Sequence, residues 1–388
     1  MDAADRARLR EAYRHFLKGD RVLLTGHSHQ AWPDVARDAL VALFDDAAAL
    51  VDDKWGRIFE IQAEVGQRIL RRMDLPEDDA IAFGQSTHEL VFRLLSCFSP
   101  AARPKVVTTS GEFHSLYRQL RRLEEEGVEV TYVPGWPREG LAERVLEAIV
   151  PGVQLVAVSA VFFEDAYVLD SLPAILARAR EVGAIPLVDA YHGFNAVPLA
   201  WGEARDTAFV TAGGYKYAGF GDGLCWLRIP RDCDLRPVFT GWFADFAGLA
   251  EPRDGRPVRY GEGAARFAGA TFDASALYRA RAVLDHWDRF GLDVPALRAS
   301  YLAQTERLLA GVSEAAVEVV TPREPARRGS FVALRHPQAK ALSQRLHDEG
   351  VWTDSRGDLL RLGPAPYLSD DELDRGAAAV TRLSRELS

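Results

Sequence analysis

Short apolar segments alternate with amphipathic segments between residues 105 and 212. The short segments predict buried strands, and most of them are followed by a segment with the apolar spacing of a helix. A strand–helix–strand rhythm of this kind predicts a mainly parallel sheet, covered by helices on both faces and joined by right-handed crossovers. The predicted strands are 105–109, 128–133, 155–159, 185–189 and 208–212, and the predicted helices among them are 114–127, 139–149 and 171–182.

The rhythm changes near residue 230. The stretch 230–270 is rich in glycine and proline and predicts loops, and long helices and an α+β tail follow it. Because 388 residues are many for one domain, we expect an N-terminal segment (1–50) that packs on the smaller domain, a large α/β domain (51–285) and a small α+β domain (286–388). The remaining predicted helices are 34–51, 56–73, 87–97, 273–290, 293–313, 337–350 and 369–386, and the remaining strands are 317–320, 330–335 and 359–362.

Charge and cysteine content narrow the class of protein. A formal net charge of −9 argues against nucleic acid as a partner, because such partners usually select a basic surface. Three cysteines without a CxxC pair are too few for a disulfide framework, so we expect a cytoplasmic protein. The first twenty residues look helical and charged, unlike a signal peptide. No apolar run approaches the roughly 20 residues that a membrane span needs, and no metal site is predicted.

The segment 186–227 carries the residues that point most directly to chemistry. Asp189 ends an apolar strand, and the carboxyl ends of parallel strands face the ligand crevice. His192 follows three residues later, and Lys216 lies among glycines, between Tyr215 and Tyr217. Pyridoxal phosphate needs a lysine that forms a Schiff base and a carboxylate that keeps the ring nitrogen protonated. Alternatively, Asp189 caps a turn and Lys216 is a solvated loop lysine, but the spacing and the uncharged surroundings favour the cofactor.

A helix N-terminus is predicted in the segment FGQSTHELVFRLL, where Ser86 and Thr87 begin the helix. Free backbone N–H groups at such an end favour a phosphate. Ser86 and Glu89 also have the spacing of an ordinary capping box. The two interpretations are compatible, because a capped helix still has other free amides.

Several further segments, spread in order over nearly the whole chain, resemble one enzyme family. The motifs are similar to those of kynureninase, a member of the class V aminotransferase superfamily of fold type I pyridoxal-phosphate enzymes. The segments that carry this resemblance are GHSHQAWP (26–33), GEFHSL (111–116), DAYH (189–192), GGYKY (213–217), TGWF (240–243), RGSFVALRHP (328–337) and RLGPAPY (361–367).

The resemblance implies a large cofactor domain with a mainly parallel seven-stranded sheet, a smaller α+β C-terminal domain, and a homodimer with shared active sites. It assigns Lys216 to the Schiff base and to proton transfer, Asp189 to the ring nitrogen, and His192 to a place beside Asp189. It further implies phosphate contacts from Ser86, Thr87, Tyr215 and Trp242, ring stacking by Phe113, a phosphate contact to the partner subunit from Thr271, binding of the substrate α-carboxylate by Arg361, and substrate-side positions for Ser28 and His29.

The chain departs from the family pattern on the substrate side. Leu116 replaces an Asp, Gly269 stands where a polar Asn contacts the aromatic substrate, and His27 and His29 replace Asn and Leu. A His-x-Arg-Pro-Trp type segment is also missing near DKWGRIFE (53–60). These departures concern the amino-acid substrate more than the cofactor.

Two enzymatic hypotheses follow. The first is a kynureninase-like hydrolase that cleaves the Cβ–Cγ bond of kynurenine or a related amino acid and releases alanine. The second keeps the cofactor but catalyses transamination or β-elimination of another amino acid. Desulfuration is disfavoured, because Cys97 and Cys225 look buried and only Cys233 resembles a loop thiol. The intact Asp189–His192–Lys216 set argues against a non-catalytic scaffold, and no G-x-G-x-x-G follows a strand, which argues against a dehydrogenase.

Overall fold

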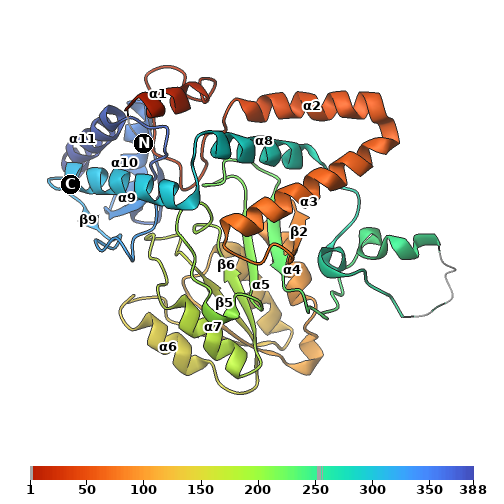
Figure 1. Ribbon diagram of the computed structural model, residues 1–388. Helices are drawn as coiled ribbons and strands as arrows, with labels where there is room; N and C mark the ends of the chain where they lie inside the picture. The colour runs from red at the N-terminus through yellow and green to blue at the C-terminus, as the bar shows by residue number, and fades with distance from the viewer. Residues whose placement is uncertain (1–2, 251–254, 256) are drawn as a thin grey trace.

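A seven-stranded sheet forms the centre of the protein (Figure 1). The computed structural model describes residues 3–250, 255 and 257–388. Neighbouring strands from β4 to β7 are parallel, whereas β8 runs antiparallel to both β7 and β2. The predicted mainly parallel α/β fold is therefore confirmed. In spatial order the strands are β2 (Ala80–Gly84), β8 (Cys225–Ile229), β7 (Phe209–Gly213), β6 (Ile185–Asp189), β5 (Val153–Ser159), β3 (Lys105–Thr109) and β4 (Glu129–Val133).

Both faces of this sheet are buried, because successive side chains of a strand point to opposite sides. In β5, Val156 and Val158 join one apolar cluster, whereas Leu155 and Ala157 join the other. The first cluster also takes the buried residues of α3, α6, α7 and α8, and the second takes those of α4 and α5. These helices are α3 (Lys54–Arg72), α4 (Thr87–Leu95), α5 (His114–Glu125), α6 (Leu141–Ala148), α7 (Leu172–Glu181) and α8 (Ser275–Arg289), with α2 (Val35–Leu50) packed on α8.

A smaller, four-stranded antiparallel sheet follows near the C-terminus. Its strands, in spatial order, are β12 (Asp354–Arg356), β13 (Leu359–Leu362), β10 (Val332–Arg335) and β9 (Glu318–Val319), and the helices of this part are α9 (Val294–Gly311), α10 (Ala339–Asp348) and α11 (Asp370–Glu386).

The N-terminal segment reaches this smaller part of the molecule. Strand β1 (Val22–Leu23) pairs in parallel with β11 (Val351–Trp352), and Arg10 of α1 (Ala3–Glu11) pairs with Glu372. Both ends of the chain lie on this side of the molecule (Figure 1). The domain boundaries at residues 50 and 285 stay predictions.

Several elements differ from the sequence-based expectation. Helix α1 ends at Glu11, and turns rather than helix follow it. The strands β1, β11 and β12 have only two or three residues, too few for an apolar period to be recognised, and the five-residue strand β2 was not predicted. The described part of 230–270 contains loops and the 3₁₀ helices η4 (Trp242–Asp245), η5 (Ala247–Ala250) and η6 (Gly263–Phe267), while residues 251–254 and 256 lie outside the described residues. None of the described helices combines the length and apolarity that crossing a membrane requires.

Candidate active site

A cavity of about 140 Å³ lies at the carboxyl ends of the parallel strands. Asp189 ends β6, and Lys216 lies in the loop between β7 and β8. The cavity therefore lies where the topology of an α/β sheet places ligands. It brings together seven of the predicted site residues, namely Ser86, Thr87, Phe113, Asp189, His192, Tyr215 and Lys216.

Lys216 is one of five lysines in the chain and the only one whose side chain is buried. Its Nζ lies 2.7 Å from Nε2 of His192. Three aromatic rings surround the amine: the Nζ lies 4.6 Å from the ring centre of Tyr191, 5.3 Å from that of Phe113 and 5.7 Å from that of Tyr215. Burial lowers the pKa of Lys216 to about 7, although Asp189 opposes this shift. The site therefore holds an amine that is neutral, and so nucleophilic, in about half of the molecules near pH 7.

Asp189 faces the same cavity, and its Oδ1 accepts a hydrogen bond of 2.9 Å from the backbone N–H of Tyr191. Burial raises the pKa of Asp189 above its usual range, against the opposing effects of that hydrogen bond and of Lys216. A buried carboxylate is stabilised by a cationic partner. A protonated ring nitrogen placed in the cavity would supply one.

His192 is oriented towards Lys216 rather than Asp189. The chain turns directly after β6, where the N–H of Gly193 donates to the carbonyl of Ala190, and His192 then reaches the lysine. No hydrogen bond joins His192 to Asp189 in the part of the chain that the structure describes. Burial and the charge of Lys216 hold the pKa of His192 well below its usual range, and its Nδ1 is buried without a partner. The imidazole is therefore neutral and shares a hydrogen bond with the lysine amine.

The first turn of α4 forms another wall of the cavity. Ser86 is the N-cap, and its Oγ accepts a hydrogen bond of 3.2 Å from the N–H of Glu89. The Glu89 carboxylate accepts the N–H of Gln85 in return, so the capping arrangement is present, with Gln85 as the donor in place of Ser86. Ser86 and Thr87 line the cavity nevertheless. The cap thus coexists with a helix N-terminus turned towards the cavity, as an anion requires.

Five predicted residues lie outside this cavity. Arg361 is buried in β13, where it binds Asp354 and the carbonyl oxygen of Phe163. Trp242 is 44% exposed, and Thr271 is exposed and lines a separate cavity of about 830 Å³ beside Gly241. Ser28 donates to the carbonyl of Thr25, and His29 stacks on Tyr215 with ring centres 5.0 Å apart.

Several residues of the site were not identified from the sequence. Ser159 ends β5 as Asp189 ends β6, so the position of strand ends would have found it. Glu112 is buried behind it and accepts hydrogen bonds from the hydroxyls of Ser159 (2.6 Å) and Thr109 (2.7 Å). Tyr191 and Cys225 also line the cavity. Burial raises the pKa of Cys225 to about 11, so its thiol is not activated.

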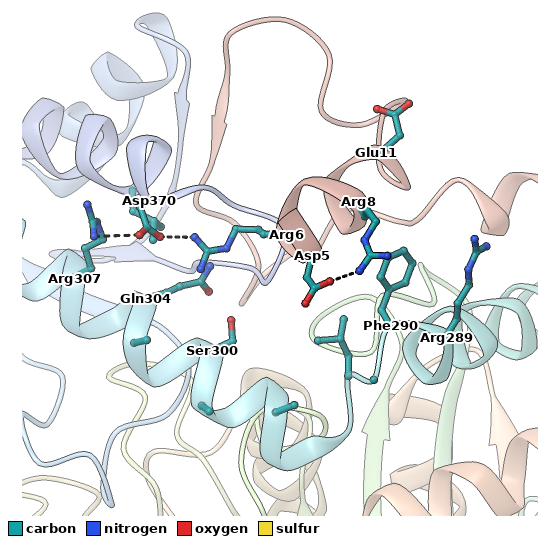
Figure 2. A pocket seen from close by; sticks show the side chains of 16 residues that line it. Asp5, Arg6, Arg8, Glu11, Arg289, Phe290, Ser300, Gln304, Arg307 and Asp370 are labelled. Atoms are coloured by element: carbon teal, nitrogen blue, oxygen red, sulfur yellow. Dashed lines mark hydrogen bonds and ion pairs between the residues drawn. The ribbon is translucent and has the colours of Figure 1, made fainter. Parts of the chain in front are cut away.

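A larger cavity of about 800 Å³ lies between α1 and α9 and contains none of the predicted site residues (Figure 2). Five of its seven charged side chains pair with one another. Arg6 and Arg307 both contact Asp370, and Arg8 contacts Asp5. Because these lining charges neutralise one another, we do not assign this cavity as the chemical centre.

The residues of the smaller cavity fit pyridoxal phosphate. They provide an amine with a lowered pKa, a buried carboxyl without a strong cationic partner, a flat aromatic wall and a helix N-terminus. Each of these features meets one part of the cofactor, namely its aldehyde, its ring nitrogen, its ring face and its phosphate. Together with the sheet, they define a fold type I pyridoxal-phosphate enzyme.

Comparison with known proteins identifies the family. Residues 297–380 match the model of the kynureninase C-terminal domain. The chain is 30% identical to a kynureninase of Deinococcus radiodurans over 322 residues, covering 79% of this chain and 74% of the relative. It is 28% identical to a kynureninase of Pseudomonas fluorescens over 374 residues, covering 89% and 84%. The chain therefore belongs to the kynureninase family.

Solved structures agree on the fold. A cysteine desulfurase from Thermococcus onnurineus superposes with a TM-score of 0.82 at 18% identity, covering 98% of both chains. A cystine C–S lyase in complex with cysteine persulfide also gives a TM-score of 0.82 at 18% identity, covering 96% of this chain and 99% of the lyase. At this identity the likeness concerns the architecture.

The rate of cofactor uptake should depend on pH through the protonation state of Lys216. The neutral amine attacks an aldehyde, and a lowered pKa means that this form predominates above about pH 7. The rate at which cofactor-free protein takes up pyridoxal phosphate should therefore rise up to about pH 7 and then level off, whereas an ordinary lysine would gain reactivity up to about pH 10. Stopped-flow absorbance from about pH 6 to pH 9, with acetyl-lysine as control, measures this. A rate that keeps rising in parallel with acetyl-lysine would contradict the assigned environment.

Proposed function

We propose that this protein is a pyridoxal-phosphate-dependent hydrolase that cleaves the Cβ–Cγ bond of kynurenine or a closely related amino acid and releases alanine. The observation that carries the proposal is the buried Lys216 amine, hydrogen-bonded to His192 and placed with Asp189 in one cavity. Membership of the kynureninase family supports the reaction class.

In this proposal each residue has one task. When bound, the cofactor supplies an electron sink for the bonds around Cα. Asp189 keeps the ring nitrogen protonated, and Phe113 packs on the ring. Ser86, Thr87 and Tyr215 hold the phosphate. Lys216 removes the α-proton and returns it, and the neutral His192 orients the amine through the hydrogen bond between its Nε2 and Nζ.

We assign substrate recognition to residues beside the cavity. Arg361 binds the α-carboxylate, a task that suits a planar donor with two parallel N–H groups. Its position supports this, because its Nη1 donates to the backbone of Phe163, which lines the cavity. His29, stacked on Tyr215, and Ser28 lie on the substrate side.

A fluorescence assay tests the reaction. Protein loaded with cofactor should release anthranilate from kynurenine, or its hydroxylated counterpart from 3-hydroxykynurenine, together with one equivalent of alanine. A loaded, folded protein that forms neither product would overturn the proposal. Pyruvate and ammonia would indicate β-elimination, and dependence on a keto acid would indicate transamination.

The second candidate, transamination or β-elimination of another amino acid, is favoured by two positions. Leu116 is buried in an apolar cluster with Leu120 and offers no polar group to a substrate. Gly269 offers no polar group either, and a side chain there would have to displace Arg93, whose Nη2 would lie 2.4 Å from an added Cβ. Desulfuration is not supported, since burial raises the thiol pKa of all three cysteines.

We also propose that the protein is a cytoplasmic homodimer. The free cysteines support the location. Apolar side chains around η4 and η5 are exposed, including Val238 (72%), Phe246 (55%) and Trp242 (44%), and monomers rarely expose such a group together. A second copy would cover them; Trp242 would contact the cofactor phosphate, and Thr271 would reach the phosphate of the cofactor in the second copy. Sedimentation velocity should show a dimer that Trp242→Ala weakens; a monomer at all concentrations would refute this.

A further inference from the structure

Asp354 and His27 form a buried arrangement with Arg361 that the assignments above leave without a role. The Nε and Nη2 groups of Arg361 donate to the two carboxylate oxygens of Asp354, with 2.9 Å between Nε and Oδ1. On its other side, Nη1 donates to the carbonyl of Phe163 at 2.6 Å. Arg361 is only 3% exposed. The guanidinium is thus held from two directions.

Asp354 is itself held in place by His27. The Nε2 of His27 donates to Oδ1 of Asp354 at 2.8 Å, the same oxygen that accepts from Nε of Arg361. His27 is fully buried, and its ring stacks on Phe331 with centres 4.7 Å apart. Burial lowers the pKa of His27 to about 4, so the ring is neutral at physiological pH and acts as a hydrogen-bond donor.

The backbone packs closely around His27, where the N-terminal segment meets the end of β13. A Cβ added at Gly363, directly after β13, would lie 2.2 Å from Nδ1 of His27. A Cβ added at Gly26 would lie 2.5 Å from the carbonyl oxygen of Pro364. The N–H of Gly26 donates to the carbonyl of Gly363 at 2.8 Å. Both glycines are therefore needed for the N-terminal segment to lie against the end of β13.

The arrangement touches the chemical centre through one aromatic ring. Phe331 contacts His27 on one side, His192 at 5.6 Å between ring centres, and Arg361 at 5.7 Å. The charge of Arg361 also lowers the pKa of both Lys216 and His192. Arg361 is therefore close to the reacting amine, although it does not line the cavity.

The donors of Arg361 show what the arrangement does. A guanidinium carries five N–H groups, and three are committed to Asp354 and Phe163. The two that remain are one on each Nη, and a carboxylate can accept both. We propose that Asp354, held by His27, is a positioning residue that fixes this free edge of Arg361 for the carboxylate of the amino-acid substrate. The proposal rests on the function assigned to Arg361 above.

Binding of two small ligands to the loaded enzyme tests this role. L-Alanine carries the carboxylate, whereas ethylamine has the same amine and carbon chain without it, and the absorbance of the cofactor reports the binding of either. Asp354→Asn should weaken alanine binding about tenfold or more, the loss of about one charge-assisted contact. It should leave ethylamine binding unchanged. His27→Phe, which keeps the stacking on Phe331, should weaken alanine binding less.

Asp79→Asn is the matched control. Asp79 forms another buried pair with an arginine, Arg228, at the opposite end of β7 from Lys216. It should leave the affinity for both ligands unchanged. Equal weakening of alanine and ethylamine by Asp354→Asn, or no weakening by either Asp354→Asn or His27→Phe, would overturn the positioning role.

Arg361→Lys separates this proposal from the assigned function. If Arg361→Lys weakens alanine binding but Asp354→Asn does not, Arg361 binds the carboxylate and the positioning role alone is wrong. If Arg361→Lys also has no effect, the assignment of Arg361 itself fails. Kinetics add a further readout, because Asp354→Asn should raise KM for the amino-acid substrate more than it lowers kcat.

Discussion

Replacing Lys216 with alanine should lower kcat by about 10²- to 10⁴-fold, the range that a positioned acid–base group contributes. The variant should also lose the covalent bond to the cofactor, because no other buried lysine is present to replace it. Absorbance after gel filtration measures retention of pyridoxal phosphate. Borohydride reduction followed by peptide mapping should locate the label at Lys216 in the native protein.

Lys340→Ala provides the matched control, because Lys340 is exposed on α10. This variant should keep the colour and the activity of the native protein. A Lys216→Ala protein that still holds a borohydride-reducible label at native stoichiometry would show that the cofactor is attached elsewhere. The cavity would then have to be reassigned.

Asp189→Asn should lower kcat by about 10²- to 10⁴-fold, since removing one partner of a buried charge pair costs about 3–5 kcal/mol. The variant should still bind the cofactor through Lys216, which separates this effect from that of Lys216→Ala. Asparagine has the shape of aspartate but cannot hold a ring nitrogen in its protonated form. Steady-state kinetics and the absorbance spectrum together measure the outcome.

The effect of Asp189→Asn on Tm should have opposite signs in the cofactor-free and the cofactor-bound protein. Burial raises the pKa of Asp189 in the cofactor-free protein, so its ionised form opposes folding at pH values above its unfolded pKa. The variant should therefore raise Tm without cofactor and lower it when the cofactor is bound. Asp170→Asn, at an exposed ion pair with Arg327, should shift Tm little in either state. A decrease in Tm by Asp189→Asn in both states would contradict this electrostatic role.

The sequence predicted the large sheet and the residues at its strand ends, because both depend on local patterns. The strands predicted from the apolar pattern at 105–109, 185–189 and 359–362 coincide with β3, β6 and β13. Asp189, Lys216 and Ser86 were found from their positions relative to predicted strands and helices. Glu112 and Asp354 were not, because each also depends on a partner from a distant segment: Ser159 lies 47 residues from Glu112, and His27 lies 327 residues from Asp354. The direction in which His192 points likewise depends on the turn directly after β6, and the sequence pattern does not predict the geometry of that turn.

The pairing of β1 with β11 has a consequence for biosynthesis. The residues around His27 are made before the strands of the large sheet, whereas Asp354, 327 residues later in the chain, and Arg361 are made after them. Domains generally fold as units while the chain emerges from the ribosome, the N-terminal part first. The nascent large sheet can therefore gather Asp189 and Lys216 early, but the carboxylate-binding end is assembled only once β12 and β13 have also emerged. An unfinished chain could hold the cofactor and would still lack the means to select an amino acid.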